Sequence, residues 1–185
     1  MPNPVVWSIQ ANGGEGITES YGYRTDVIPA YTNAEQRVHQ RSVALEALEF
    51  GIAAVEARES QLATSIIFAK QADVLAVPLW QYGSRITADV IATATFLPIG
   101  DALVVPYRIP GYAVLWRDAF TYELVTVIAR DGTGLTLSAP GLASGWPAST
   151  LVFPARSGRL SDRVWVKRDS TRVLTGRVRF TMEQV

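Results

Sequence analysis

Hydrophobic and polar residues alternate in short runs over most of the chain, and this pattern predicts a protein built mainly of β-strands. The runs are rich in Val, Ile, Thr and aromatic residues, and they are separated by Gly, Pro, Asp and Ser, as in strands joined by turns. The predicted strands cover residues 5–9, 21–28, 74–80, 85–95, 112–116, 122–129, 135–138, 150–153, 163–167 and 173–182.

Two segments between these strands have a different character. The polar stretch 32–41 is predicted to be a loop, because it lacks a run of alternating apolar positions. The next stretch, 42–52, alternates as a strand does, but the Leu, Ala and Glu residues that recur in it also favour helices. The pattern alone therefore leaves strand and helix open for residues 42–52.

Residues 54–72 are predicted to be a helix. Apolar residues recur there at helical spacing and form a stripe that consists of Val55, Leu62, Ile66 and Ala69. Acidic residues near the start of the segment and a lysine near its end match the polarity of the helix dipole.

The segment 123–137 predicts a β-hairpin. Apolar residues occupy both sets of alternating positions between residues 124 and 128, which suits a strand buried on both faces or nearly so. Asp131-Gly132-Thr133-Gly134 then supplies a tight turn, and residues 135–137 return.

Together these elements predict an α+β fold that is predominantly antiparallel β. It has one main helix at about 54–72 and a barrel- or sandwich-like β region. We expect a single domain over 1–185, with an N-terminal part of strands and helix (1–79) and a barrel-like part (80–185).

Length and composition agree with this expectation. A chain of 185 residues can bury a sizeable core without staples, and the absence of cysteine removes disulfides and thiolate metal sites. No basic start precedes an apolar run, and no stretch reaches the ~20 apolar residues that span a bilayer. We therefore expect a soluble chain without a membrane anchor.

The net charge of zero hides an uneven distribution along the sequence. Residues 1–149 hold nine Lys or Arg and fourteen Asp or Glu, a balance of −5, whereas residues 150–185 hold eight and three, a balance of +5. Such a chain can meet copies of itself head to tail if the imbalance persists in the fold. The alternative, given even weight, is that folding scatters these charges over a solvated surface.

The usual signatures of catalysis are weak in this sequence. His39 is the one histidine, there is no cysteine, and neither a dinucleotide fingerprint nor a phosphate-binding loop occurs. Three pairs of carboxylates could in principle serve a glycosidase: Glu46 with Glu49, Glu56 with Glu59, and Asp118 with Glu123. The second pair is better explained as first-turn acids of the helix, and the third as exposed loop ends.

The C-terminal part is rich in arginine and raises the question of nucleic acid. Its cations could form a stripe that contacts phosphates, interleaved with Trp165 and Phe180. The period of Arg177-Val178-Arg179-Phe180 is that of a half-exposed strand, and the rest of the chain is acidic, so a subunit interface is the better interpretation.

Among the five tryptophans, the core is the default for Trp80 and Trp116, which end apolar strands. Trp146 lies in a Gly-Trp-Pro loop, and we expect it to be partly exposed. It is the candidate ligand-facing aromatic, although a role as a plug under the end of the barrel is favoured over that of a ligand platform.

An ordered series of short motifs resembles the tail-tip structural proteins of long-tailed, siphovirus-type bacteriophages, in particular distal tail and hub-ring proteins. The main elements are Arg24-Thr25-Asp26-Val27, Glu35-Gln36-Arg37 with Arg41, and Val77-Pro78-Leu79-Trp80. Further elements are the strand pair at 123–137, Trp146-Pro147-Ala148, Pro154 and Gly158-Arg159-Leu160. The resemblance implies a strand at 42–52.

It also implies a non-enzymatic component of a ring, hexameric or of another symmetry, that joins the tail tube to the hub or receptor-binding parts. The implied partners are copies of the chain and the tube, hub and fibre proteins. No cofactor, metal or sequence-specific nucleic acid is expected, and the implied location is the virion tail tip after assembly in the host cytoplasm. The predicted subunit-interface residues are Glu35, Arg37, Arg41, Arg177 and Arg179.

Two other functions compete with this one. The first is a carbohydrate- or receptor-binding module of the tail, which requires exposed aromatic residues near polar groups. The second is a polysaccharide-degrading tail enzyme, which requires two carboxyl groups roughly 5 to 10 Å apart in a cleft.

Overall fold

The computed structural model describes residues 4–22, 25–29, 35–39, 45–161, 164–170 and 172–183. Half of the chain lies in strands and 10% in a single helix. Among the described strand pairs, β1 and β6 run parallel and the others antiparallel. The prediction of an α+β fold that is predominantly antiparallel is confirmed.

The elements of the first part surround the helix. They are β1 (Val5–Val6), β2 (Ile17–Gly22), β3 (Thr25–Pro29), β4 (Glu35–His39), β5 (Leu45–Ala54), α1 (Ala57–Ala69), β6 (Leu75–Pro78) and the short 3-10 helix η1 (Trp80–Tyr82). The strand that the resemblance implied at 42–52 is present as β5.

The second part consists of strands and loops. Its strands are β7 (Ser84–Arg85), β8 (Phe96–Pro98), β9 (Gly111–Asp118), β10 (Thr121–Arg130), β11 (Gly134–Leu137), β12 (Leu151–Leu160), β13 (Trp165–Arg168) and β14 (Leu174–Met182).

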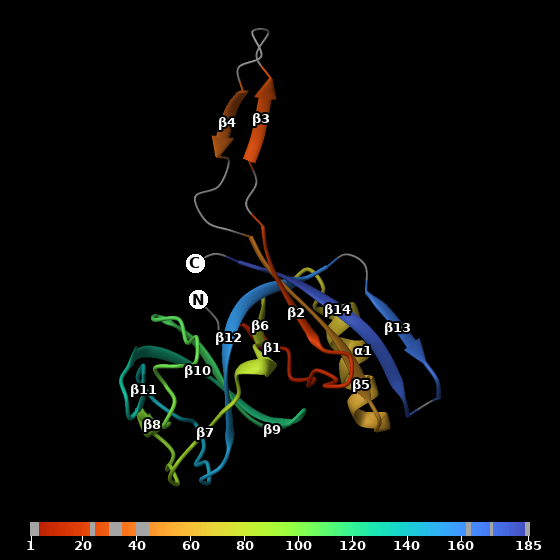
Figure 1. Cartoon of the computed structure of the whole chain (residues 1–185). Helices are drawn as coiled ribbons and strands as arrows, with labels where there is room; N and C mark the ends of the chain where they lie inside the picture. The colour runs from red at the N-terminus through yellow and green to blue at the C-terminus, as the bar shows by residue number, and fades with distance from the viewer. Residues whose placement is uncertain are drawn as a thin grey trace.

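Twelve strands form one branched sheet with the order β2-β5-β14-β12-β9-β10-β11-β8, to which β1, β6, β7 and β13 attach. The path ends at β2 on one side and β8 on the other, so the sheet is open and sandwich-like. In Figure 1, β8, β10 and β11 lie to one side of β12, while β5, β13, β14 and α1 lie to the other.

Strand β12 connects these two sides. Its first half pairs with β9, from Leu151 to Ala155, and its last residues pair with β14, from Gly158 to Leu160. Along the other edge it pairs with β7 and then with β6. One strand of ten residues therefore belongs to both halves of the sheet.

Two hydrophobic cores lie on either side of this strand. The first packs α1 and β6 against β5 and β14, and it includes Trp7, Phe50, Ile66, Trp80 and Phe180. The second lies within β7 to β11, and it includes Ile86, Leu97, Leu115, Val127 and Trp146. Phe153 and Leu160 of β12 contribute to the first core and Val152 to the second.

The helix is shorter than predicted at both ends. Ala54 still pairs with Leu174 as the last residue of β5, so α1 begins only after Glu56 and ends at Ala69. Ile66 is buried and Leu62 packs against the first core, as the stripe predicted, but Val55 precedes the helix and is exposed.

Two predicted strands are corrected by the structure. Residues 87–95 form bends and isolated bridges instead of a strand, with their alternation of Thr and Ala on exposed positions, and β8 follows where none was predicted. The predicted strand 21–28 is divided between β2 and β3, which belong to different sheets.

The β10–β11 hairpin is confirmed, with Asp131 accepting the N–H groups of Thr133 and Gly134 in the turn. The prediction that β10 is buried on both faces, or nearly so, is not confirmed. Val125 and Val127 point into the second core, but Ile128 is half exposed. Strand β14 alternates between buried and exposed residues as its sequence predicted.

We expect Phe180→Ala to destabilise the protein by about 3–5 kcal/mol, because it leaves a cavity where Phe180 stacks on Phe50 and contacts Trp7 edge to face. Chemical unfolding followed by tryptophan fluorescence measures this change. Thr181→Ala is the control on the exposed face of the same strand, with an expected change below ~0.5 kcal/mol. Equal losses in the two variants would contradict the assigned facing of β14.

Candidate functional site

The two sequence motifs with the clearest resemblance are the two strands of one ribbon. Strands β3 and β4 pair with each other, with Val27 opposite Arg37 and Pro29 opposite Glu35. They form a separate two-stranded sheet that stands away from the body in Figure 1. The prediction of a loop at 32–41 is therefore wrong for residues 35–39, because pairing with β3 makes this polar segment a strand.

Arg24 and Arg41, which also belong to these motifs, lie outside the described residues. Glu35 and Arg37 are placed in β4 by its backbone. The structure thus brings the Thr-Asp-Val and Glu-Gln-Arg segments together without joining them to the twelve-stranded sheet.

A buried ion cluster lies where the chain leaves the ribbon and enters the body. Glu46, the second residue of β5, is only 6% exposed, and Arg156 in the middle of β12 is 7% exposed. A carboxylate oxygen of Glu46 lies 2.6 Å from a terminal nitrogen of Arg108 and the other lies 3.9 Å from Nε of Arg156. Three distant parts of the sequence therefore meet through charge.

Arg156 is the most constrained member of this cluster. One terminal nitrogen donates to the carbonyl of Pro106 at 2.7 Å, while its buried Nε has no hydrogen-bond partner in the described part of the chain. Burial lowers the pKa of the Arg156 guanidinium, the nearby charge of Arg108 lowers it further, and Glu46 raises it. Glu46 thus compensates a charge that burial disfavours.

Strand β2 extends the cluster toward the base of the ribbon. The Tyr21 hydroxyl donates to Glu19 at 3.1 Å, and the Gln81 amide donates to the other oxygen of that carboxylate. Partial burial and then the hydrogen bond to Glu19 raise the pKa of Tyr21 to about 12. Polar contacts therefore hold β2 to η1.

The outer face of β14 carries the two interface arginines that were predicted in the C-terminal part. Arg177 and Arg179 point outward from β14, and Trp165 of β13 lies directly opposite Arg177. Directly opposite residues share a face of a sheet. Trp165 is 80% exposed, which is unusual for so large an apolar side chain.

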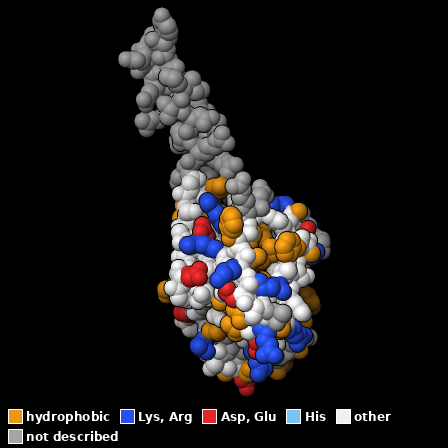
Figure 2. Space-filling view, turned by 90° about the vertical axis from the view of Figure 1, so that its right-hand side faces the viewer, with side chains coloured by type: hydrophobic (Ala, Val, Ile, Leu, Met, Phe, Trp, Pro, Cys, Tyr) orange, Lys and Arg blue, Asp and Glu red, His pale blue; other side chains and the backbone are white. Residues whose placement is uncertain are grey.

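We call Trp165, Lys167, Arg177 and Arg179 the β13–β14 face. In Figure 2, which views the molecule from this side, Lys and Arg side chains are spread between hydrophobic ones, with Asp and Glu side chains among them. Strand β13 pairs with β14 alone among the described strands, so its other edge is open.

The charge imbalance of the sequence is partly compensated in the fold. Arg177 pairs with Glu49 of β5 at 2.6 Å, Arg159 with Glu183 at 2.7 Å, and Arg156 lies near Glu46. A continuous phosphate-contacting stripe does not form, since Arg156 and Phe180 are buried. Lys167 and Arg179 remain on the exposed surface.

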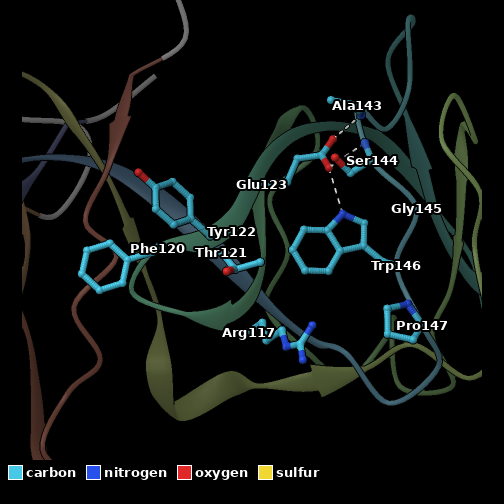
Figure 3. Close-up of a pocket in the computed structure, with 10 residues that line it drawn as sticks. All are labelled: Arg117, Phe120, Thr121, Tyr122, Glu123, Ala143, Ser144, Gly145, Trp146 and Pro147. Carbon is cyan, nitrogen blue, oxygen red and sulfur yellow. Dashed lines mark hydrogen bonds between the residues drawn. The ribbon is translucent and has the colours of Figure 1, made fainter. Parts of the chain in front are cut away.

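Trp146 is buried, with 7% of its surface exposed, so the expectation of partial exposure is wrong. It belongs to the second core, and its indole N–H donates to Glu123 at 2.8 Å (Figure 3). The alternative of a plug at the end of the β region fits this position. One edge of the ring still lines a surface hollow.

The carboxylate pairs considered for catalysis have other contacts. Glu46 and Glu49 lie on opposite faces of β5, because three residues along a strand reverse the facing of the side chain. Glu59 lies in the first turn of α1, as predicted, whereas Glu56 stands at the N-cap position without a side-chain hydrogen bond to the helix. Asp118 accepts the N–H groups of Phe120 and Thr121, and the first of these hydrogen bonds is the main reason for its lowered pKa.

Sequence inspection missed the buried cluster and the exposure of Trp165. The cluster joins residues from β5, the 106–110 loop and β12, and no local spacing relates them. Trp165 had a signal in principle, since it lies between basic residues in a short strand near the basic end of the chain.

No known family model matches the sequence, and no curated protein is similar to it. Within the described ranges, no helix has the length and apolar character needed to cross a bilayer. Those same residues hold no group of three or more metal-ligating His, Cys, Asp or Glu side chains.

We expect Glu46→Gln to lower the free energy of unfolding by about 3 kcal/mol, because it leaves Arg156 buried beside Arg108 without a counter-charge. Glu49→Gln is the matched control. It lies on the same strand and breaks an ion pair of comparable length, but that pair is partly exposed, so the expected cost is below ~1 kcal/mol. Urea unfolding of both variants separates the two cases, and similar losses would show that the buried cluster has no special role.

Proposed function

We propose that this chain is a structural, non-enzymatic component of a bacteriophage tail tip. Copies of it form a ring that joins the tail tube to the hub or receptor-binding apparatus. The observation that carries the proposal is the placement of the resembling motifs. Thr25-Asp26-Val27 and Glu35-Gln36-Arg37, two of the segments that resemble tail-tip proteins, form a ribbon outside the main sheet.

A two-stranded ribbon outside a core is at best marginally stable in water. Within the described part of the chain, β3 and β4 pair with each other and with no strand of the body. We infer that a neighbouring molecule covers the ribbon in the assembled state. A second copy of the chain is the simplest neighbour, because each copy would then both offer and receive a ribbon.

The β13–β14 face supplies a suitable receiving surface. A large exposed aromatic residue between cations is typical of the energetically dominant part of an interface. On that face Lys167 pairs with Asp169 at 2.5 Å and Arg177 with Glu49 at 2.6 Å, so the face presents both signs of charge to a ribbon that carries Asp26, Glu35 and Arg37. Contact between two different surfaces is head to tail, and its repetition gives a ring when the rotation between copies closes.

The resemblance implies a ring that is hexameric or of another symmetry, the tail tip of the virion as the location, and the tube, hub and fibre proteins as neighbours. Assembly would take place in the host cytoplasm. The function in this proposal rests on complementary surfaces, and it needs no cofactor.

We expect the double variant Arg37→Glu/Arg41→Glu to remain folded and to fail to assemble. Reversing two charges between residues 37 and 41 opposes the proposed contact with a neighbour, while substitutions on a protein surface usually change stability by less than ~0.5 kcal/mol. Sedimentation velocity measures the loss of the oligomer, and circular dichroism measures the fold.

Arg85→Glu/Arg117→Glu is the matched control, since it reverses two exposed charges in the other half of the molecule. This variant should assemble as the unaltered chain does. An Arg37→Glu/Arg41→Glu variant that still forms the full oligomer would refute the role of the ribbon, and an unfolded one would place these arginines in an internal network instead.

A further inference from the structure

A hollow of about 330 Å³ lies between the β9–β10 turn and the 143–147 loop (Figure 3). Its size is at the lower end of the range for small-ligand sites. Arg117 and Tyr122 line it from the turn, and Trp146 and Pro147 line it from the loop. It is distant in the fold from the ribbon and belongs to the second half of the molecule.

The walls of this hollow are fixed by hydrogen bonds. The Glu123 carboxylate accepts the N–H groups of Ala143 and Ser144 and the indole N–H of Trp146. The backbone groups of Trp146 also exchange two hydrogen bonds with Val90. The site is therefore formed before a ligand arrives, which reduces the entropic cost of binding.

Two groups in the hollow can recognise a ligand. Arg117 is exposed and forms no ion pair or hydrogen bond with the described residues. Glu123 accepts three hydrogen bonds, whereas a carboxylate has about four acceptor positions.

The positions of these groups restrict the ligand. In Figure 3, the Arg117 guanidinium and the Glu123 carboxylate lie on opposite sides of the Trp146 indole. A simple anion would satisfy Arg117 but would be repelled by Glu123, and a neutral sugar would leave Arg117 without a partner. A sugar ring with one carboxylate and several hydroxyl groups satisfies both.

We propose that this hollow binds an acidic sugar unit of a polysaccharide. The sugar carboxylate accepts from Arg117, and a hydroxyl group of the sugar donates to Glu123. The ring of Phe120, another residue at the hollow, already contacts a cation of the protein, because Cζ of Arg58 lies 4.1 Å from the centre of that ring.

Saturation-transfer NMR and titration of the full chain test this site. The probes are trigalacturonate, a hyaluronan hexasaccharide and sialyllactose, with methyl-esterified trigalacturonate and citrate as comparisons. We expect at least one of the acidic saccharides to bind with a Kd of about 1 mM or lower. Removing the carboxylate charge or the sugar ring should abolish that binding.

Arg117→Gln should weaken the binding at least about tenfold, because it removes a charge-assisted hydrogen bond. Arg85→Gln, an exposed arginine outside the hollow, should leave it unchanged. Failure of all three saccharides to bind, equal binding of citrate or the methyl ester, or equal losses in the two variants would overturn the proposal. The readout does not depend on assembly, so its outcome is separate from that of the ring proposal.

Discussion

Strand β12 changes its hydrogen-bonding partner near Arg156, and the arrangement of both halves of the molecule depends on that change. It pairs with β9 up to Ala155 and with β14 from Gly158 onward. At the second contact the strands are so close that a Cβ on Gly158 would lie 2.8 Å from Sδ of Met182. A single strand thereby fixes the position of the first core relative to the second.

The change of partner explains why charge is buried at this point. Arg156 occupies the gap between the two pairings, and its desolvation is compensated by Glu46 and by the carbonyl of Pro106. Glu46 lies at the start of β5, next to the base of the β3–β4 ribbon. This ion cluster therefore has two roles: it completes the junction of the two halves, and it holds β5 at the end that is next to the ribbon. It thereby links the core of the subunit to the proposed contact surface.

Local periodicity was sufficient for the elements whose burial is decided by their own sequence. The helix, the β10–β11 hairpin and the alternating facing of β14 were predicted because each shows its period within one segment. Strand β4 was missed because its polar sequence becomes a strand only by pairing with β3. The stretch 87–95 was predicted as a strand because it is rich in Val, Ile and Thr, but most of its residues are exposed and it forms bends instead.

The candidate surfaces were only partly accessible from the sequence, for a similar reason. Arg177 and Arg179 were correctly expected to lie on the exposed side of a strand. The Glu46 cluster and the hollow beside Trp146 are formed by residues that are distant in the sequence, so only the fold brings them together. The contact between the ribbon of one copy and the β13–β14 face of the next remains the central claim.

Cysteine cross-linking tests this contact most directly, because the chain has no cysteine of its own. One cysteine is introduced at Arg37 on the ribbon and one at Lys167 on the β13–β14 face, and the assembled protein is oxidised. A disulfide forms only where the two Cα atoms approach within about 7 Å. The account predicts a ladder of covalent oligomers that ends at the closed ring, whereas a chain that stays monomeric after oxidation, with both thiols free, would contradict it.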